Sequence, residues 1–322
     1  MKISDISKIA LYGAGRIGGD LAAYFAFKGL EVSVYVRSDA AAERAKLAVQ
    51  APVDSYLRYG LVANSAALLR KISITTDLAV AFNDAYFIHE NGADILNQKH
   101  EIIAEIERYA PEDAIIASSS SCIPAAKIAE NAKRPERVIV AHPFGPAYLI
   151  PLIEICRGEK TSDEVVQNAV EFYRAHGKTP IVLRKDNTGF IANRLALALW
   201  REELALVDEG VCTLEEADNA VCFGPGLNWG IMGPAMGYGL SLWERGLYGR
   251  TTRPDDDEDM AGDADDGLPE MAVTPEKWPD ISEEQLMPLM ANMPCHVGTT
   301  KQEIASFRDY MLIEMLKIHQ KL

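Results

Sequence analysis

Four polar side chains in the sequence have the types that the oxidation of an alcohol requires. When hydride leaves the carbon, a base must take the hydroxyl proton, and histidine suits this because its unperturbed pKa is about 6.5. A neighbouring carboxylate fixes the tautomer of such a base and stabilises the cation that forms, while a hydroxyl and an amide hold the substrate oxygen. The residues that fit the base, the carboxylate, the hydroxyl and the amide are His142, Glu154, Ser121 and Asn193.

Each of these residues also has an ordinary structural interpretation. His142 could be a hydrogen-bonded histidine of the core, the serines at 118–121 could form a turn and a helix cap, and Asn193 could be a surface amide. Glu154 is more informative, because an unpaired carboxylate within the apolar run 149–155 would cost several kcal/mol. We therefore expect Glu154 to have a buried partner.

A glycine-rich turn near the N-terminus predicts a dinucleotide site. It lies between an apolar segment at 8–12, typical of a buried strand, and a helical pattern at 16–28 that leads to a second strand at 31–36. In G-x-G-x-x-G spacing, the first glycine permits the bend, the second lets the backbone approach a pyrophosphate, and the third lets helix and strand pack closely. The helix N-terminus presents free N–H groups to the phosphates. The alternative is a turn without a ligand, but the residues we expect to bind are Gly13, Gly15, Arg16, Ile17 and Gly18.

Strand and helix patterns alternate through the first part of the chain. The further strands that we expect are 72–75, 86–90, 114–118, 138–142 and 180–183, with helices at 40–49, 94–109 and 162–176. Such alternation predicts a Rossmann-type α/β fold, in which a doubly wound, mostly parallel sheet carries helices on both faces. Ligands of these sheets bind beyond the carboxyl ends of the strands, which is where Ser121 and His142 fall.

The pattern changes near residue 187, beyond which no strand is convincing. A long helix is expected at 190–208, and further helices begin near Thr213, Ser282 and Thr300. We therefore expect a dinucleotide-binding domain at 1–186 and an all-helical domain at 187–322. An acidic insertion near 250–270 (its acidic run is 255–266) lacks the spacing of a calcium-binding loop, so we expect a solvated loop there and no metal site.

Composition excludes several classes of partner. The net charge of −15 argues against nucleic acid, and no apolar run approaches the roughly 20 residues of a membrane span. The segment 1–8 lacks the apolar core of a signal peptide, which favours the cytoplasm. The five cysteines form no metal-ligand cluster, so we expect buried free thiols.

In combination, the motifs resemble the 3-hydroxyacyl-CoA dehydrogenase superfamily from about residue 8 to residue 240. The Ser-Cys-Ile-Pro124 and Pro151-Leu-x-Glu154 details are most similar to the branch that acts on free hydroxy acids, which includes lambda-crystallin (L-gulonate 3-dehydrogenase) and L-carnitine dehydrogenase; the passage 224–229 is similar to the latter. The motifs that carry the resemblance are Gly13-x-Gly-x-x-Gly18, Ser120-Ser121-Cys122, His142-Pro-x-x-Pro146, Pro151-Leu-x-Glu154 and Gly189-Phe-Ile-x-Asn193-Arg194.

The resemblance implies a role for each candidate. His142 would be the catalytic base, Glu154 its partner, and Ser121 and Asn193 contacts to substrate or nicotinamide; Glu90 would lie near the nicotinamide ring. It also implies a homodimer and hydride transfer between nicotinamide and C3 of an L-3-hydroxy acid. Because no long helical hairpin that could hold CoA is evident after the second strand, we expect a small free acid rather than an acyl thioester.

Three positions depart from the family pattern. The second strand, which in relatives ends in an acidic residue, here continues into Val36, Arg37 and Ser38, and an arginine with a serine would accept the 2′-phosphate that a carboxylate repels. We therefore expect NADP rather than NAD, the alternative being an exposed arginine beside bound NAD. Gly145 replaces an asparagine and removes a side-chain amide, so we expect different hydrogen bonding near the substrate. Asn228 replaces an arginine; if that arginine binds a substrate carboxylate in relatives, we expect another substrate here.

Two other functions remain open at this point. One is a 3-hydroxyacyl-CoA dehydrogenase. The other is a dinucleotide-binding, crystallin-like protein without significant turnover, against which the complete set of Ser121, His142, Glu154 and Asn193 argues, because binding alone does not require it.

Overall fold

The computed structural model describes residues 6–237, 303, 310 and 311. The chain divides into two units, residues 1–199 and 200–322, and each is described by itself. The predicted helix starts at Ser282 and Thr300 and the acidic run 255–266 lie outside the described residues.

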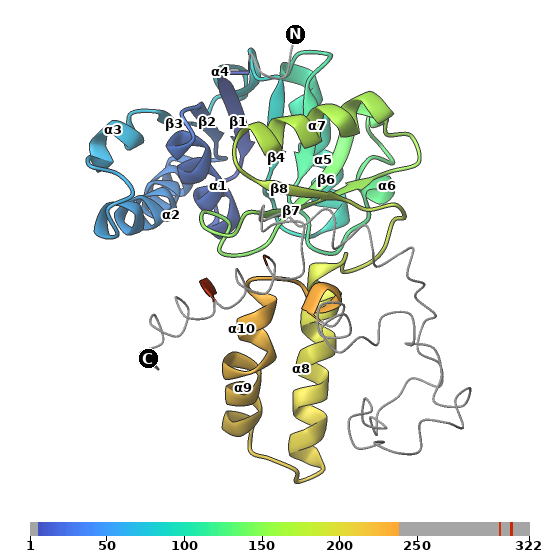
Figure 1. The fold of residues 1–322 in the computed structure, drawn as a ribbon. Coiled ribbons are helices and arrows are strands. Elements are labelled where there is room, and N and C mark those ends of the chain that lie inside the picture. Colours follow the sequence, from blue (N-terminus) through green and yellow to red (C-terminus); the bar gives the residue numbers. More distant parts are fainter. Residues whose placement is uncertain (1–5, 238–302, 304–309, 312–322) are drawn as a thin grey trace, which may run out of the picture. The chain divides into compact units, whose positions relative to one another are not determined.

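An eight-stranded sheet forms the centre of the first unit, with strand order β3-β2-β1-β4-β5-β6-β7-β8 (Figure 1). Every neighbouring pair is parallel except β6 and β7, which run antiparallel. This confirms the predicted mostly parallel, doubly wound sheet. The strands are β1 Lys8–Tyr12, β2 Glu31–Tyr35, β3 Ile72–Thr75, β4 Phe87–Glu90, β5 Ile115–Ser118, β6 Val138–Pro143, β7 Leu152–Arg157 and β8 Thr179–Val182.

Helices cover both faces of this sheet, because successive residues of a strand point to opposite faces. In β1, Ile9 and Leu11 join the core beneath α1, α2 and α7, whereas Ala10 and Tyr12 join the core beneath α4, α5 and α6. The helices of this unit are α1 Arg16–Phe27, α2 Asp39–Arg58, α3 Ser65–Leu69, α4 Leu78–Phe82, α5 Leu96–Tyr109, α6 Ala125–Ile128 and α7 Asp163–Ala175, with a short 3₁₀ turn at Pro135–Arg137.

The segment between β2 and β3 is more helical than the sequence indicated. A helix was expected at 40–49, but α2 has 20 residues and includes Pro52, and the five-residue α3 follows it. A proline usually marks a helix end, which is why the pattern predicts too short a helix. A long helical hairpin was not expected here. The structure has one long helix, α2, but the helix that follows it, α3, is too short to form a second arm.

A long helix, α8 Ala192–Asp208, begins in the first unit and ends in the second. The described part of the second unit continues with α9 Leu214–Phe223, whose capping box joins Thr213 and Glu216, and with α10 Pro225–Trp229. No strand occurs in this described part, as predicted for a helical C-terminal domain. None of the described helices is long and apolar enough to cross a membrane.

The cysteines correct one expectation. The four that the structure describes are free, but among them Cys156 alone is buried, while Cys122 and Cys222 are exposed. Scattered spacing excludes a cluster but says little about burial, so the prediction of buried thiols was wrong for these two.

A buried histidine in β4 is held by a chain of hydrogen bonds. His89 lies 2.6 Å from the hydroxyl of Tyr173 through Nε2 and 3.0 Å from Ser119 Oγ through Nδ1. Because Ser119 donates its own proton to Asn91 Oδ1, at 2.7 Å, its oxygen accepts from His89 Nδ1–H, and Nε2 then accepts from Tyr173. The ring is therefore neutral, and burial lowers the pKa of His89 to about 3.

This burial predicts a loss of stability in acid. Between pH 6.5 and about pH 3 the unfolded chain binds a proton at His89 that the folded chain refuses, so the free energy of unfolding falls as the pH is lowered through this range. We expect His89→Gln to make the dependence shallower by up to about 1.4 kcal/mol per pH unit. Urea unfolding followed by circular dichroism from pH 4.5 to 7 measures the slope, and an unchanged slope contradicts the assignment.

Candidate active site

Two neighbouring strands bring His142 and Glu154 together near the carboxyl end of β6. β6 and β7 are antiparallel neighbours, and in their register His142 lies directly opposite Glu154. His142 Nδ1 is 2.9 Å from Glu154 Oε2, and both side chains are buried. His142 and Glu154 are twelve residues apart because β6 and β7 form a hairpin, whose loop is 144–151. The sequence analysis missed β7, because a short apolar run after Pro151 gives no clear strand pattern.

The second carboxylate oxygen of Glu154 is held by the chain just before and at the start of α8. Oε1 accepts the backbone N–H of Ile191 at 2.8 Å and of Ala192 at 3.0 Å. The chain reaches this position through Gly189 and Phe190, both with positive φ, of 78° and 52°. A left-handed conformation is strained for phenylalanine, and the buried Phe190 ring, 5.2 Å from the His142 ring, fixes it there. Glu154 therefore has the buried partners that its position requires.

This arrangement determines the tautomer of His142. An ionised carboxylate only accepts hydrogen bonds, so Nδ1 carries the proton that faces Glu154 and Nε2 keeps its lone pair. None of the described residues forms a hydrogen bond with Nε2. The pair can therefore take a proton at Nε2 while Glu154 stabilises the resulting cation, as expected for a general base and its orienting partner.

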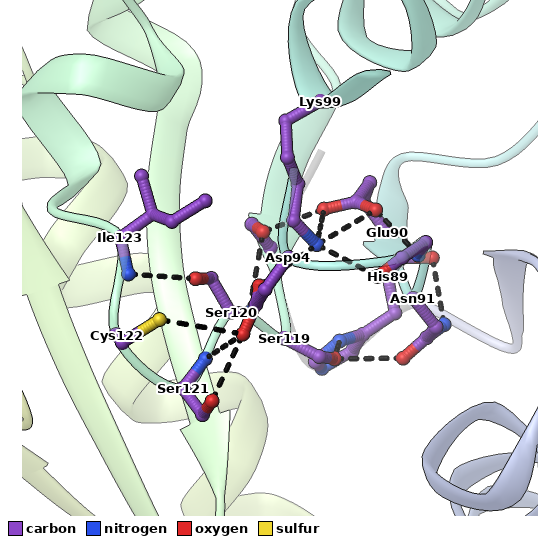
Figure 2. Close-up of polar contacts among 12 residues, drawn as sticks. His89, Glu90, Asn91, Asp94, Lys99, Ser119, Ser120, Ser121, Cys122 and Ile123 are labelled. Atoms are coloured by element: carbon purple, nitrogen blue, oxygen red, sulfur yellow. Dashed lines mark hydrogen bonds and ion pairs between the residues drawn. The ribbon is translucent and has the colours of Figure 1, made fainter. Parts of the chain in front are cut away.

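Ser121 is held by Asp94 rather than by His142 (Figure 2). Its backbone N–H and its hydroxyl both donate to Asp94 Oδ2, at 3.0 and 2.9 Å. Burial raises the pKa of Asp94, but hydrogen bonds from Ser121 and Ser120 and the charge of Lys99 outweigh it, so the pKa is lowered. Asp94 thus fixes the loop that follows β5, the strand next to β6. The sequence analysis did not identify this carboxylate.

Glu90 belongs to a buried ionic network rather than to an open surface. Its carboxylate accepts from Ser118 Oγ at 2.6 Å and from the Gly92 N–H at 2.5 Å, and Lys99 Nζ lies 2.8 Å from Oε2. Lys99 also approaches Asp94, at 3.5 Å (Figure 2). The network links the ends of β4 and β5 to α5. The implied position of Glu90 near a nicotinamide ring stays a prediction.

Asn193 is the second residue of α8 and is partly exposed. It follows Ala192, whose N–H binds Glu154. In the described part of the chain no hydrogen bond joins Asn193 or Ser121 to the His142–Glu154 pair. The structure therefore brings together two of the four candidates directly, and the other two lie on neighbouring elements.

A pocket of about 560 Å³ lies at the glycine-rich turn. A Cβ atom added at Gly15 would meet no atom within 4 Å, whereas one at Gly18 would lie 2.2 Å from Gly13 O. Gly15 thus leaves room for a ligand, and Gly18 permits close packing, as the motif requires. Of the predicted cofactor-binding residues, those that line the pocket are Gly13, Gly15, Arg16, Arg37 and Ser38. Ile17, Gly18 and Glu90 do not, because Ile17 packs against the core and the other two are buried.

The far wall of this pocket is basic. Arg37 donates through Nε to Tyr12 Oη at 3.0 Å, and Tyr12 donates to Glu105 at 2.6 Å. Ser38 caps α2, its hydroxyl accepting the N–H of Ala41. A residue that the sequence analysis missed, Arg44, also lines the pocket; its signal was the helical spacing of positions 41, 44 and 48 along α2. In the part of the chain that the structure describes, no aspartate or glutamate lines the pocket.

The described residues contain no group of three His, Cys, Asp or Glu side chains that could hold a metal ion. The acidic run of the predicted insertion is not among those residues.

Comparison with known proteins gives the family. The model of the 3-hydroxyacyl-CoA dehydrogenase NAD binding domain matches residues 8–187, and that of the C-terminal domain of 3-hydroxyacyl-CoA dehydrogenase matches residues 189–264. The chain is 37% identical over 243 residues to L-carnitine dehydrogenase of Streptomyces coelicolor, covering 76% of each chain. It is 40% identical over 245 residues to L-carnitine dehydrogenase of Burkholderia mallei, again covering 76% of each.

A solved structure agrees with this assignment. The crystal structure of (S)-3-hydroxybutyryl-CoA dehydrogenase from Ralstonia eutropha has a TM-score of 0.63 and 27% sequence identity, over 75% of this chain and 85% of that one. With its doubly wound sheet, glycine-rich turn and two matching domains, the chain belongs to the 3-hydroxyacyl-CoA dehydrogenase family and is an oxidoreductase that acts on a CH–OH group.

Proposed function

We propose that the protein transfers hydride from C3 of a small, free L-3-hydroxy acid to NADP, giving a 3-oxo acid. The observation that carries the proposal is the buried His142–Glu154 pair, with Nε2 of His142 free to accept a proton. The bound nicotinamide supplies the hydride acceptor. His142 takes the hydroxyl proton at Nε2, and Glu154 stabilises the cation while the Ile191 and Ala192 amides keep its carboxylate in place. In the reverse direction, protonated His142 returns the proton.

Ser121 and Asn193 are proposed to hold the substrate oxygen or the nicotinamide, and Glu90 to support the nicotinamide side of the site. Asp94 fixes both the backbone and the hydroxyl of Ser121, and because the hydroxyl proton is given to Asp94, the Ser121 oxygen would accept, which fits a contact to an N–H of the nicotinamide amide. The start of α8 supports the role of Asn193, since the amide of the preceding residue binds Glu154.

A free acid is supported by relatives whose names specify L-carnitine, itself a 3-hydroxy acid. Gly145 is exposed and carries no side-chain amide, so hydrogen bonding near the substrate would differ from that of the family's asparagine-bearing members. The 20-residue α2 keeps acyl-CoA substrates as a second candidate, because it supplies one arm of a possible CoA-binding hairpin.

NADP is supported by the charge of the pocket. Arg16, Arg37 and Arg44 line it, and among the described residues no carboxylate does. Tyr12 orients Arg37 through Nε, and its two terminal nitrogens form no hydrogen bond with a described residue, so both can bind a phosphate. Glu105, the carboxylate behind Tyr12, is engaged by the tyrosine hydroxyl. The charged side chains that line the pocket, among the described residues, are therefore all positive.

Three further proposals concern the whole protein. The domain boundary lies at 186/187, which the ranges of the two family models support. The helical domain at 187–322 forms a homodimer. The protein works in the cytoplasm, and its net charge of −15 argues against nucleic acid partners.

Replacement of His142 tests the mechanism. We expect His142→Ala to reduce kcat roughly 10²–10⁴-fold for L-carnitine or the best acid of an L-3-hydroxy acid panel, because the base is lost. Binding of the reduced cofactor, followed by its fluorescence, should not change. His100→Ala is the control, since the hydrogen bonds of His100 with described residues are to Lys127 and Asn131, outside the site. Undiminished turnover by His142→Ala would refute the mechanism, and faster turnover of 3-hydroxybutyryl-CoA than of any free acid would establish the second candidate.

Two glycine substitutions test whether the pocket holds the dinucleotide. Gly15→Ala should weaken cofactor binding by about tenfold or more while the free energy of unfolding stays within about 0.5 kcal/mol, because the added methyl group occupies only the ligand's space. Gly18→Ala should destabilise the protein by about 1–3 kcal/mol, because its methyl group overlaps Gly13. Urea unfolding measures the stability of both variants, and cofactor fluorescence measures their binding. Unchanged binding by Gly15→Ala contradicts the assignment of this pocket to the dinucleotide.

Replacement of Arg37 tests the cofactor preference. Arg37→Leu should raise KM for NADP by about 10- to 100-fold, the effect of losing a hydrogen bond to a charged group, and leave KM for NAD unchanged. Arg58→Leu is the control, because Arg58 is the last residue of α2, the helix that follows Arg37, and does not line the pocket. If the unmodified protein has a higher kcat/KM with NAD than with NADP, the proposed preference is wrong.

A further inference from the structure

The loop 144–151 joins the strand of His142 to the strand of Glu154, and side chains from distant parts of the chain hold its backbone. Lys178 Nζ donates to Ala147 O at 2.6 Å and to Ile150 O at 2.8 Å. Asp20 Oδ2 accepts the N–H of Ala147 at 2.9 Å. Because a hairpin loop fixes how its two strands meet, these bonds bear on the geometry of the catalytic pair.

Lys178 is an unusual group to bury. It is 3% exposed, forms no salt bridge within the described residues, and has its ammonium 3.9 Å from the centre of the Tyr24 ring. Burial lowers the pKa of Lys178 to about 8, the charge of Asp20 opposes this shift, and that of Lys28 adds to it. A buried ammonium without a carboxylate partner is costly, so two carbonyls of one loop are a specific target rather than an incidental contact.

Asp20 connects the same loop to the cofactor end of the sheet. It lies in α1, the helix that begins at the glycine-rich turn, and is itself 7% exposed. Burial raises the pKa of Asp20, and the hydrogen bond from Ala147 opposes the shift. The N–H and the C=O of one residue, Ala147, are therefore held by Asp20 and Lys178, one on each side.

We propose that Lys178 and Asp20 are positioning residues, which clamp the loop 144–151 through Ala147 and so align the His142–Glu154 pair with helix α1 and the dinucleotide. The inference rests on the proposed function of His142. Neither residue touches the substrate; both act through the loop. Their loss should therefore lower kcat and leave cofactor binding unchanged.

The test uses Lys178→Met, which keeps the length of the side chain and removes its donors, together with Asp20→Asn and the double variant. Lys28→Met is the matched control, because Lys28 lies 5.5 Å from the same Tyr24 ring but is exposed and forms no hydrogen bond with a described residue. Hydrogen–deuterium exchange of peptides covering 144–151 reports on the loop without requiring turnover. Steady-state kinetics and cofactor fluorescence report on the site.

We expect Lys178→Met to speed exchange in 144–151 and to lower kcat, each by about tenfold, with the cofactor Kd unchanged; the scale is that of losing a hydrogen bond to a charged group. The double variant should lose no more than the worse single variant, because both groups act on one residue. Lys28→Met should match the unmodified protein. If Lys178→Met does not fold, Lys178→Gln and Asp20→Asn carry the same test.

Three outcomes would each overturn the proposal. They are unchanged exchange in the loop, an unchanged kcat per cofactor-binding site, and a double variant whose loss is the product of the two single losses. These outcomes differ from a failure of the proposed function. Undiminished turnover by His142→Ala would remove the catalytic role but would leave the exchange of 144–151 as a direct measure of the clamp.

Discussion

The burial of one carboxylate, that of Glu154, governs the arrangement of the candidate site. Each of its oxygens must be satisfied, and they are met from two directions, by His142 in the neighbouring strand and by the Ile191 and Ala192 amides. The first contact comes from the antiparallel register of β6 and β7. The second comes from the chain that follows the strained turn at Phe190. The one antiparallel pair of the sheet and the strained backbone therefore both serve the same buried charge.

Other charged groups are buried around this site, and they differ in the partners that satisfy them. Glu90 and Lys99 neutralise each other inside the sheet edge, and Asp94 is reached by the same ammonium. Lys178, in contrast, is satisfied by carbonyl dipoles and an aromatic face. Buried polar groups of this kind are costly if they lose one partner, so they fix geometry more sharply than apolar packing does. This suits an edge of the sheet where several loops must keep fixed relative positions.

Much of this was predictable from the sequence, because the signals are local. The glycine spacing gave the first turn, alternating patterns gave seven of the strands within a few residues, and the position of Glu154 in an apolar run required a partner. What could not be predicted depends on contacts distant in the chain. The antiparallel register of β7, the length of α2 through Pro52, and the roles of Asp94 and Lys178 arise only when separate segments meet.

Helix α1 shows why such contacts matter for the chemistry. Its first turn lies at the pocket proposed for the dinucleotide, and Asp20, little more than one turn further on, binds the loop between the strands of His142 and Glu154. A helix is a stiff element. The proposed hydride acceptor at its start and the proposed proton acceptor, His142, are therefore both positioned by α1 rather than by two independent loops. Hydride and proton transfer need the reacting atoms in close alignment, and an error of about 1 Å in a distant support can slow such chemistry severely. The cost of burying Asp20 and Lys178 is therefore best understood as the cost of that alignment.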